Sequence, residues 1–165
     1  MTTSSDRPAR VGIITDKTGA LSFMGIANAN VATMVVDDIN GAGGLLGHPI
    51  ELFIEDSATE DSAAEAAATK LIEDVQVDVV LGGIYSSTRQ AIKGPVVEQG
   101  NTLYIYPEQY EGQECHPLIF CTGPVPAQQV EPLFPRLMEK TGAKTFFRMS
   151  SRSASAKSAS TPHSR

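Results

Sequence analysis

Short apolar runs rich in β-branched residues alternate along this chain with amphipathic segments of ten or more residues, and this alternation constrains the fold most strongly. The runs lie at residues 11–15, 50–54, 77–81, 103–106 and 118–122, and in the second of them Ile50, Leu52 and Ile54 alternate with Glu51, Phe53 and Glu55. Helical segments follow the first three runs, at residues 24–40, 62–73 and 87–99. Strands joined through helices form right-handed βαβ units with both sheet faces covered. The sequence therefore predicts an α/β fold built on a doubly wound parallel sheet.

Local signals predict where the helices end. The apolar residues of the first segment recur at helical spacing, and Gly41 then predicts a terminating residue in the left-handed conformation. Asp61 or Ser62 is placed to cap the second helix. Gly94 and Pro95 predict a kink in the third.

Length and charge limit the function classes. A chain of 165 residues has room for one domain with a hydrophobic core. Its formal net charge of -6 argues against nucleic acid, whose phosphates require a basic surface. The first ten residues hold no apolar run of the length that a signal peptide needs, and no run suits a membrane span. We therefore expect a cytoplasmic chain as it stands, without membrane insertion, or a periplasmic one if the true start lies upstream.

Enzyme and metal motifs are not supported. The glycine run GAGGLLGH follows a helix and lacks the Lys-Ser/Thr of a phosphate loop, so a glycine turn is the better interpretation. Cys115, His116 and Cys121 are without the second ligand pair of a zinc site. The carboxylates Glu108 and Glu111 have no accompanying nucleophile. The sequence predicts neither a catalytic site nor a cofactor or metal, although a small α/β enzyme stays as a minor alternative.

One longer pattern is more specific. Residues 18–83 carry, in order, Thr18-Gly19, Gly25, Ile39-Asn40, Gly43-Gly44-x-x-Gly47, Asp56 and Leu71-Ile72. Their order and spacing resemble the opening of type I periplasmic (solute) binding proteins, and the resemblance covers residues 10–147. It implies two lobes that close on a ligand by a hinge, of which this chain spans the first.

Three further stretches resemble the urea- and short-chain-amide-binding branch of the Leu/Ile/Val-binding-protein-like superfamily: IYSSTRQAIKGPVVE, YPEQYEGQE and FCTGPVPAQQ. In that branch the positions of Ser86, Tyr106, Pro107 and Glu108 line the cleft. The predicted parallel sheet indicates the same region independently, because ligands of open sheets bind outside the carboxyl ends of strands. The segments at those ends are residues 16–23, 56–59, 84–88 and 107–112. Tyr85 and Ser22 are further candidates from these segments.

The candidate residues suit a small amide. Hydroxyls of Ser86 and Tyr106 can satisfy its N–H and carbonyl groups. Glu108 stands where the branch usually has a neutral residue, and an ionised carboxylate favours a ligand with several N–H groups or a positive charge. Two alternatives stay open: Glu108 lies on the solvated rim, or Tyr85, Tyr106 and Tyr110 only pack the loop.

The resemblance implies the substrate-binding component of an ABC-type importer for a small polar solute, with a permease as partner. The alternative is a cytosolic amide sensor of an amidase operon, with a regulatory protein as partner. The predicted plan is a disordered N-terminus at 1–9, a ligand-binding lobe at 10–122, the start of a second lobe at 123–147 and a disordered Ser/Arg/Ala tail at 148–165. That tail is typical of a shifted reading frame, so we expect a frameshifted or fragmentary product, or else a one-lobe protein. Half a cleft should bind weakly.

Overall fold

The computed structural model describes residues 7–147 and contains one five-stranded, all-parallel sheet. The strand order is β2-β1-β3-β4-β5. The strands are β1 (Ala9–Thr15), β2 (Ile50–Asp56), β3 (Val79–Gly82), β4 (Leu103–Tyr106) and β5 (Ile119–Cys121). Each lies within or next to an apolar run of the sequence, so the predicted doubly wound α/β fold is confirmed.

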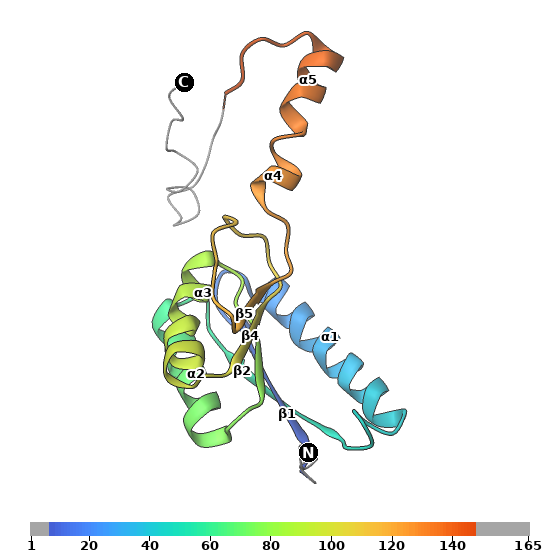
Figure 1. Ribbon diagram of the computed structural model, residues 1–165, viewed down its shortest axis with the longest axis vertical. Coiled ribbons are helices and arrows are strands. Elements are labelled where there is room, and N and C mark those ends of the chain that lie inside the picture. Colours follow the sequence, from blue (N-terminus) through green and yellow to red (C-terminus); the bar gives the residue numbers. More distant parts are fainter. Residues whose placement is uncertain (1–6, 148–165) are drawn as a thin grey trace.

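Helices cover the two faces of the sheet unequally (Figure 1). On one face lies α1 (Ser22–Gly41), which contacts β1 and β2. On the other lie α2 (Asp61–Lys70) and α3 (Ser86–Lys93), which pack on each other. Each continues into a π-helical turn, η1 (Leu71–Val75) and η2 (Gly94–Gln99). The connection to β2 therefore runs on one face and the connection to β3 on the other, which places the switch point of the fold between β1 and β3.

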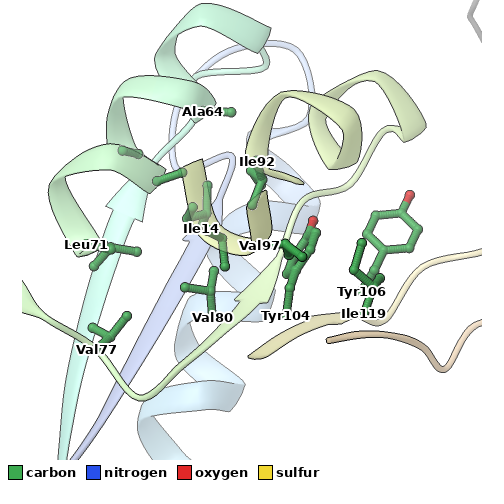
Figure 2. Close-up of a cluster of buried hydrophobic side chains, with 13 residues drawn as sticks. Ile14, Ala64, Leu71, Val77, Val80, Ile92, Val97, Tyr104, Tyr106 and Ile119 are labelled. Atoms are coloured by element: carbon green, nitrogen blue, oxygen red, sulfur yellow. The ribbon is translucent and has the colours of Figure 1, made fainter. Parts of the chain in front are cut away.

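The main core lies between the sheet and the α2 and α3 layer (Figure 2). Its largest fully buried side chains include Ile14, Leu71, Tyr104 and Tyr106. Tyr104 and Tyr106 are two residues apart on β4, so both rings point to the same face. A layer this well filled makes the strands and their carboxyl ends a rigid base for the loops that follow them.

The opposite face is only partly covered. Leu81, Ile105 and Phe120 are register neighbours on β3, β4 and β5, and they alternate with core-facing residues. The Phe120 side chain is 56% exposed, and on α1 Phe23 is 72% exposed. Among residues 7–147, α1 alone covers this face, and it contacts only the β1 and β2 side closely.

Two predicted helix ends differ from the structure. Gly41 stays inside α1, and Gly43 and Gly44 instead take the positive φ angles of 105° and 80°. Their position is explained by the Gly44 N–H, which donates to the Ile39 carbonyl oxygen at 2.9 Å and closes the helix end. At α2 the cap position is Glu60, with no side-chain cap bond, so neither Asp61 nor Ser62 caps that helix. The regular helix α3 does stop at Gly94, where η2 begins.

After β5 the chain contains two short helices, α4 (Pro126–Gln129) and α5 (Leu133–Thr141), which project away from the sheet (Figure 1). Residues 144–147 form no strand, because a strand needs a ladder partner and the described residues supply none there. At the other end β1 already begins at Ala9, inside the predicted N-terminal tail of 1–9.

The predicted tail at 148–165 lies outside the described residues. Within residues 7–147, no helix has the length and apolar character needed to cross a membrane.

Candidate functional site

The candidate residues gather at the carboxyl ends of three neighbouring strands. Ser22 follows β1, Tyr85 and Ser86 follow β3, and Pro107 and Glu108 follow β4. Because β1, β3 and β4 are adjacent in the sheet, their following loops lie along one edge. This edge includes the switch point, where open α/β sheets hold their ligands.

The loops after β1 and β2 are fastened together by buried polar groups. The Ser57 hydroxyl donates to the Asp16 carboxylate, and both side chains are fully buried. Asp56 accepts hydrogen bonds from the Thr18 hydroxyl at 2.7 Å and from the Ala58 N–H at 2.8 Å. Burial opposes ionisation of Asp56, but these bonds hold its pKa below the ordinary value. The first loop is therefore rigid where it leads into α1.

Ser22, the candidate of the first loop, is half-buried at the first residue of α1. The helix reaches this position because Gly25 lets it approach the preceding loop. A Cβ at Gly25 would lie 1.9 Å from the Asp16 carbonyl oxygen. Only glycine fits at that contact.

The second loop places Tyr85 and Ser86 at the start of α3. Tyr85 is the extended cap residue of the helix, and its side chain is 44% exposed. Its carbonyl oxygen accepts a hydrogen bond from the Arg89 N–H at 3.0 Å, which closes the first helical turn. Ser86 is half-buried as the first helical residue. Tyr85 thus reaches solvent, and Ser86 lies between solvent and the protein interior.

Tyr106 lies beneath this edge. Its side chain is fully buried, and its hydroxyl donates to the Ile84 carbonyl oxygen at 2.9 Å. Burial raises the pKa of the phenol to about 12, against the opposing influence of the Arg89 charge. The structure shows Tyr106 as a packing residue that joins two loops (Figure 2). Its contact with a ligand stays a prediction.

Pro107 and Glu108 begin the segment between β4 and β5. Pro107 is exposed and Glu108 is half-buried. Desolvation raises the pKa of the Glu108 carboxyl above its ordinary value. The segment lies close to the chain after β5, since a Cβ at Gly123 would meet the Glu108 carbonyl oxygen at 2.0 Å. In residues 7–147 no side-chain hydrogen bond or ion pair satisfies the Glu108 carboxylate.

A buried charge cluster beside this edge was missed by the sequence analysis. The Arg89 side chain is 5% exposed, and its Nη2 lies 2.9 Å from the Glu111 carboxylate. The Glu114 side chain is 6% exposed, and its Oε1 forms an ion pair with Lys93 Nζ at 2.9 Å. Although burial acts the other way, hydrogen bonding from Ser86 and Arg89 holds the pKa of Glu111 below its ordinary value.

A signal for this cluster was present in the sequence. Arg89 is in helical register with Ile92 and Val96, both of them core residues. A cation on the buried stripe of a helix requires partners, because an unpaired buried charge is costly. Glu111 and Glu114, three residues apart after the next strand, supply them.

The arrangement offers hydrogen bonds and charge to a solute. Within the part of the chain that the structure describes, no group of three or more His, Cys, Asp and Glu side chains is placed to hold a metal ion. Cys115 is exposed and Cys121 half-buried, with burial raising the pKa of the Cys121 thiol. A surface hollow lies elsewhere, lined only by residues of α2 and η1, and none of the six candidates lines it.

A family model described as a periplasmic binding protein domain matches residues 9–157. The chain belongs to this family. The match extends over the whole sheet and the helices that cover it.

Curated relatives of this periplasmic binding protein domain include the "Leu/Ile/Val-binding protein BraC3" of Rhizobium johnstonii, 31% identical over 90 residues, or 54% of this chain and 24% of the relative. An "Amino acid binding protein" of Pseudomonas aeruginosa is 33% identical over 78 residues, or 47% of this chain and 21% of the relative. The matched part thus spans about a quarter or less of the length of these relatives.

Solved structures share the fold. The branched-chain amino acid transporter substrate-binding protein LivJ of Streptococcus pneumoniae, in complex with isoleucine, matches with a TM-score of 0.76 at 24% identity, over 83% of this chain and 40% of that one. A fatty acid ABC transporter substrate-binding protein of Thermomonospora curvata matches with a TM-score of 0.73 at 23% identity, over 86% of this chain and 36% of that one. The family match and the likeness to BraC3 confirm the prediction of a Leu/Ile/Val-binding-protein-like periplasmic binding domain, and these structures show its fold. These relatives carry amino-acid and fatty-acid names, so the urea and amide branch is not supported by them.

Proposed function

We propose that this domain is part of the substrate-binding component of an ABC-type importer, and that it binds a small solute rich in N–H groups. A short amide, urea or a small amine has this chemistry. Membership of the periplasmic binding protein family and the transporter names of the similar structures support the first part of the proposal.

The Glu108 carboxylate carries the second part. It lies at the carboxyl end of β4, is half-buried, and has no protein partner among the described residues. Partial desolvation without a partner is unfavourable for the charged form, in line with its raised pKa. A ligand N–H group would supply the missing donor in a charge-assisted hydrogen bond.

Ser86 complements this acceptor. A hydroxyl can both donate and accept, so it can bind the carbonyl oxygen of an amide while Glu108 binds its N–H groups. Tyr106 supports both positions from below through its bond to Ile84. Tyr85 and Pro107 are exposed next to these two residues in the chain and would enclose the ligand from the sides.

An amino acid is the second candidate ligand. The names of BraC3 and LivJ favour it, and LivJ is seen with isoleucine. The ammonium of an amino acid would suit Glu108 as well as an amine would. Its carboxylate, however, would bring a second negative charge to an edge that already holds Glu108.

Nuclear magnetic resonance titration of the 15N-labelled chain tests the proposal, since it detects weak binding and locates it. Urea, acetamide, ethylamine and isoleucine would be added in turn. We expect the first three to shift the amide resonances of residues 85–88 and 107–110. A response to isoleucine alone would favour the second candidate, and shifts confined to other parts of the chain would contradict both.

The variant Glu108→Gln keeps the shape of the side chain and removes its charge. We expect the affinity for ethylamine or urea to fall by about tenfold or more, the equivalent of one charge-assisted hydrogen bond. Glu98→Gln is the matched control, because Glu98 is an exposed carboxylate on η2. An unchanged dissociation constant for every ligand would place Glu108 on the solvated rim.

A further inference from the structure

Arg89 is the most deeply buried cation in the described residues, at 4% exposure. It lies on the first turns of α3, three residues after Ser86. Taking a guanidinium out of water is unfavourable unless partners replace the lost hydration. The groups that contact Arg89 must therefore replace its hydration.

Both acidic partners come from the segment between β4 and β5. Nη2 of Arg89 lies 2.9 Å from Glu111, and Nε lies 3.4 Å from Glu114. Lys93 and Gln90 on the same helix also reach Glu114, at 2.9 Å and 3.4 Å. Side chains of α3 thus bind two carboxylates, Glu111 and Glu114, that are three residues apart.

The rest of the guanidinium meets aromatic rings. Its central carbon lies 4.9 Å from the centroid of Tyr106 and 5.7 Å from that of Tyr110. Nε and Nη1 are buried and form no hydrogen bond. The ring faces therefore supply the favourable contact that these donors do not find in an acceptor.

Within residues 7–147, few main-chain hydrogen bonds join this segment to the rest of the chain. Residues 107–116 form neither helix nor strand, and their main-chain bonds to the rest of the chain include Tyr110 N–H to the Pro124 carbonyl oxygen at 3.3 Å. Glu108 lies in this segment and Ser86 lies on α3. The distance between these two candidate ligand contacts thus depends on how the segment is fastened to the helix.

We propose that Arg89 is a positioning residue of the ligand edge, which sets Glu108 against Ser86 by clamping residues 107–116 to α3 through Glu111, Glu114, Tyr106 and Tyr110. The consequence for ligand binding rests on the proposed function, and the clamping itself does not. The guanidinium is suited to this role because its flat fork can serve two carboxylates while its face stacks on an aromatic ring. A lysine in its place keeps the charge and loses both the fork and the stacking surface.

Hydrogen exchange measured residue by residue in the ligand-free chain tests the clamp. Arg89→Lys and Glu111→Gln are the test variants, because each is a small change. We expect each variant to speed exchange of the Tyr110 amide, which donates to the Pro124 carbonyl oxygen, by about tenfold or more, while Val80 and Tyr104 in the sheet change by less than about twofold. Lys70→Met is the matched control, because it removes an ion pair to Glu55 on β2, the strand at the other end of the sheet from β5.

The tyrosine band of the near-ultraviolet circular dichroism spectrum gives a second readout. The chain has four tyrosines and no tryptophan, so this band reports the surroundings of the tyrosine rings, and for Tyr106 and Tyr110 these include the Arg89 guanidinium. We expect Arg89→Lys to alter the band and Glu111→Gln to alter it less, because the latter keeps the cation. Lys70→Met should leave it unchanged.

Two exchange results would overturn the proposal. Unchanged exchange of the Tyr110 amide in both test variants would show that the segment is held by other contacts. An equal loss of protection in the segment, Val80 and Tyr104 would show that Arg89 only supports the core.

Ligand titration tests the consequence for binding. We expect the urea or ethylamine dissociation constant to rise by about tenfold in both variants. If no ligand shifts the resonances of the unaltered chain, the proposed function fails, and the exchange result still decides the role of Arg89.

Discussion

The Tyr106 hydroxyl donates a 2.9 Å hydrogen bond to the Ile84 carbonyl oxygen, which joins the end of β4 to the loop after β3. Tyr104 makes the equivalent bond to the Gly82 carbonyl oxygen at 3.0 Å. Both rings are fully buried on the same face of the sheet (Figure 2). The two phenols form a matched pair, one of which was predicted to contact the ligand.

We expect Tyr106→Phe and Tyr104→Phe to lower the free energy of unfolding by similar amounts, about 1–2 kcal/mol each, because each leaves a carbonyl oxygen unpaired. Urea denaturation followed by circular dichroism measures this. Ligand affinity then separates the two residues. A larger loss of affinity in Tyr106→Phe would support its predicted contact, and equal effects would restrict Tyr106 to packing.

Gly25 and Gly41 lie on the same helix and should respond in opposite ways to alanine. A Cβ at Gly25 would overlap the Asp16 backbone at 1.9 Å, whereas nothing lies within 4 Å of one at Gly41. We expect Gly25→Ala to destabilise the chain by about 2–3 kcal/mol. Gly41→Ala should stabilise it by up to about 1 kcal/mol, because alanine is the better helix former. Thermal unfolding compares them, and a tolerated Gly25→Ala would mean that α1 is free to move away from the first loop.

The sheet was predictable because most of its strands lie in short apolar runs between strong turn signals. Leu103–Tyr106 is an example: the run ends at Pro107, and β4 has the predicted bounds. The end of α1 was not predictable to the residue. Three of the four residues after Asn40 are glycines, and which of them turns left-handed depends on the hydrogen bond from Gly44 to Ile39.

The candidate site was predictable as a region and not as a set of contacts. Strand adjacency brings the loops of Ser86 and Glu108 to one edge, and the sequence implies this once the sheet is parallel. The partner of the Tyr106 hydroxyl follows from three-dimensional packing. Arg89 was missed because a single arginine on an amphipathic helix is usually solvated, and its burial depends on carboxylates that follow the next strand.

Glu108 and Glu111 should have opposite effects on stability as the pH changes. The folded-state pKa of Glu108 is raised by desolvation, so its charged form destabilises the fold, and this penalty disappears as the pH falls through that raised pKa. For Glu111, burial acts to raise the pKa, but hydrogen bonding from Ser86 and Arg89 lowers it overall. Its stabilisation is present above the ordinary pKa and is lost as the pH falls through the lowered one.

We therefore expect Glu108→Gln to be more stable than the unaltered chain at neutral pH, with the gain vanishing in acid. Glu111→Gln should be less stable at neutral pH, with the deficit vanishing at a lower pH than the gain does. Urea denaturation repeated across the acid range measures both differences. Two curves that change in the same direction would show that the two carboxyls share one environment.

The last helix, α5, should exchange its amide hydrogens far faster than the sheet. It spans Leu133–Thr141, and none of its residues is buried. Its Phe134 ring instead meets the Phe146 ring of the same segment, at 4.9 Å between centroids and 83° between planes. A nine-residue helix without burial is only marginally stable in water. We expect α5 amides to lose protection without global unfolding, and Phe134→Ala to speed their exchange while leaving the free energy of unfolding of the whole chain unchanged.

Protection of α5 equal to that of Val80 would contradict this and would mean that α5 docks on the sheet domain or on a second copy of the chain. Repeating the measurement at several protein concentrations separates these two, because only docking between copies strengthens as the concentration rises.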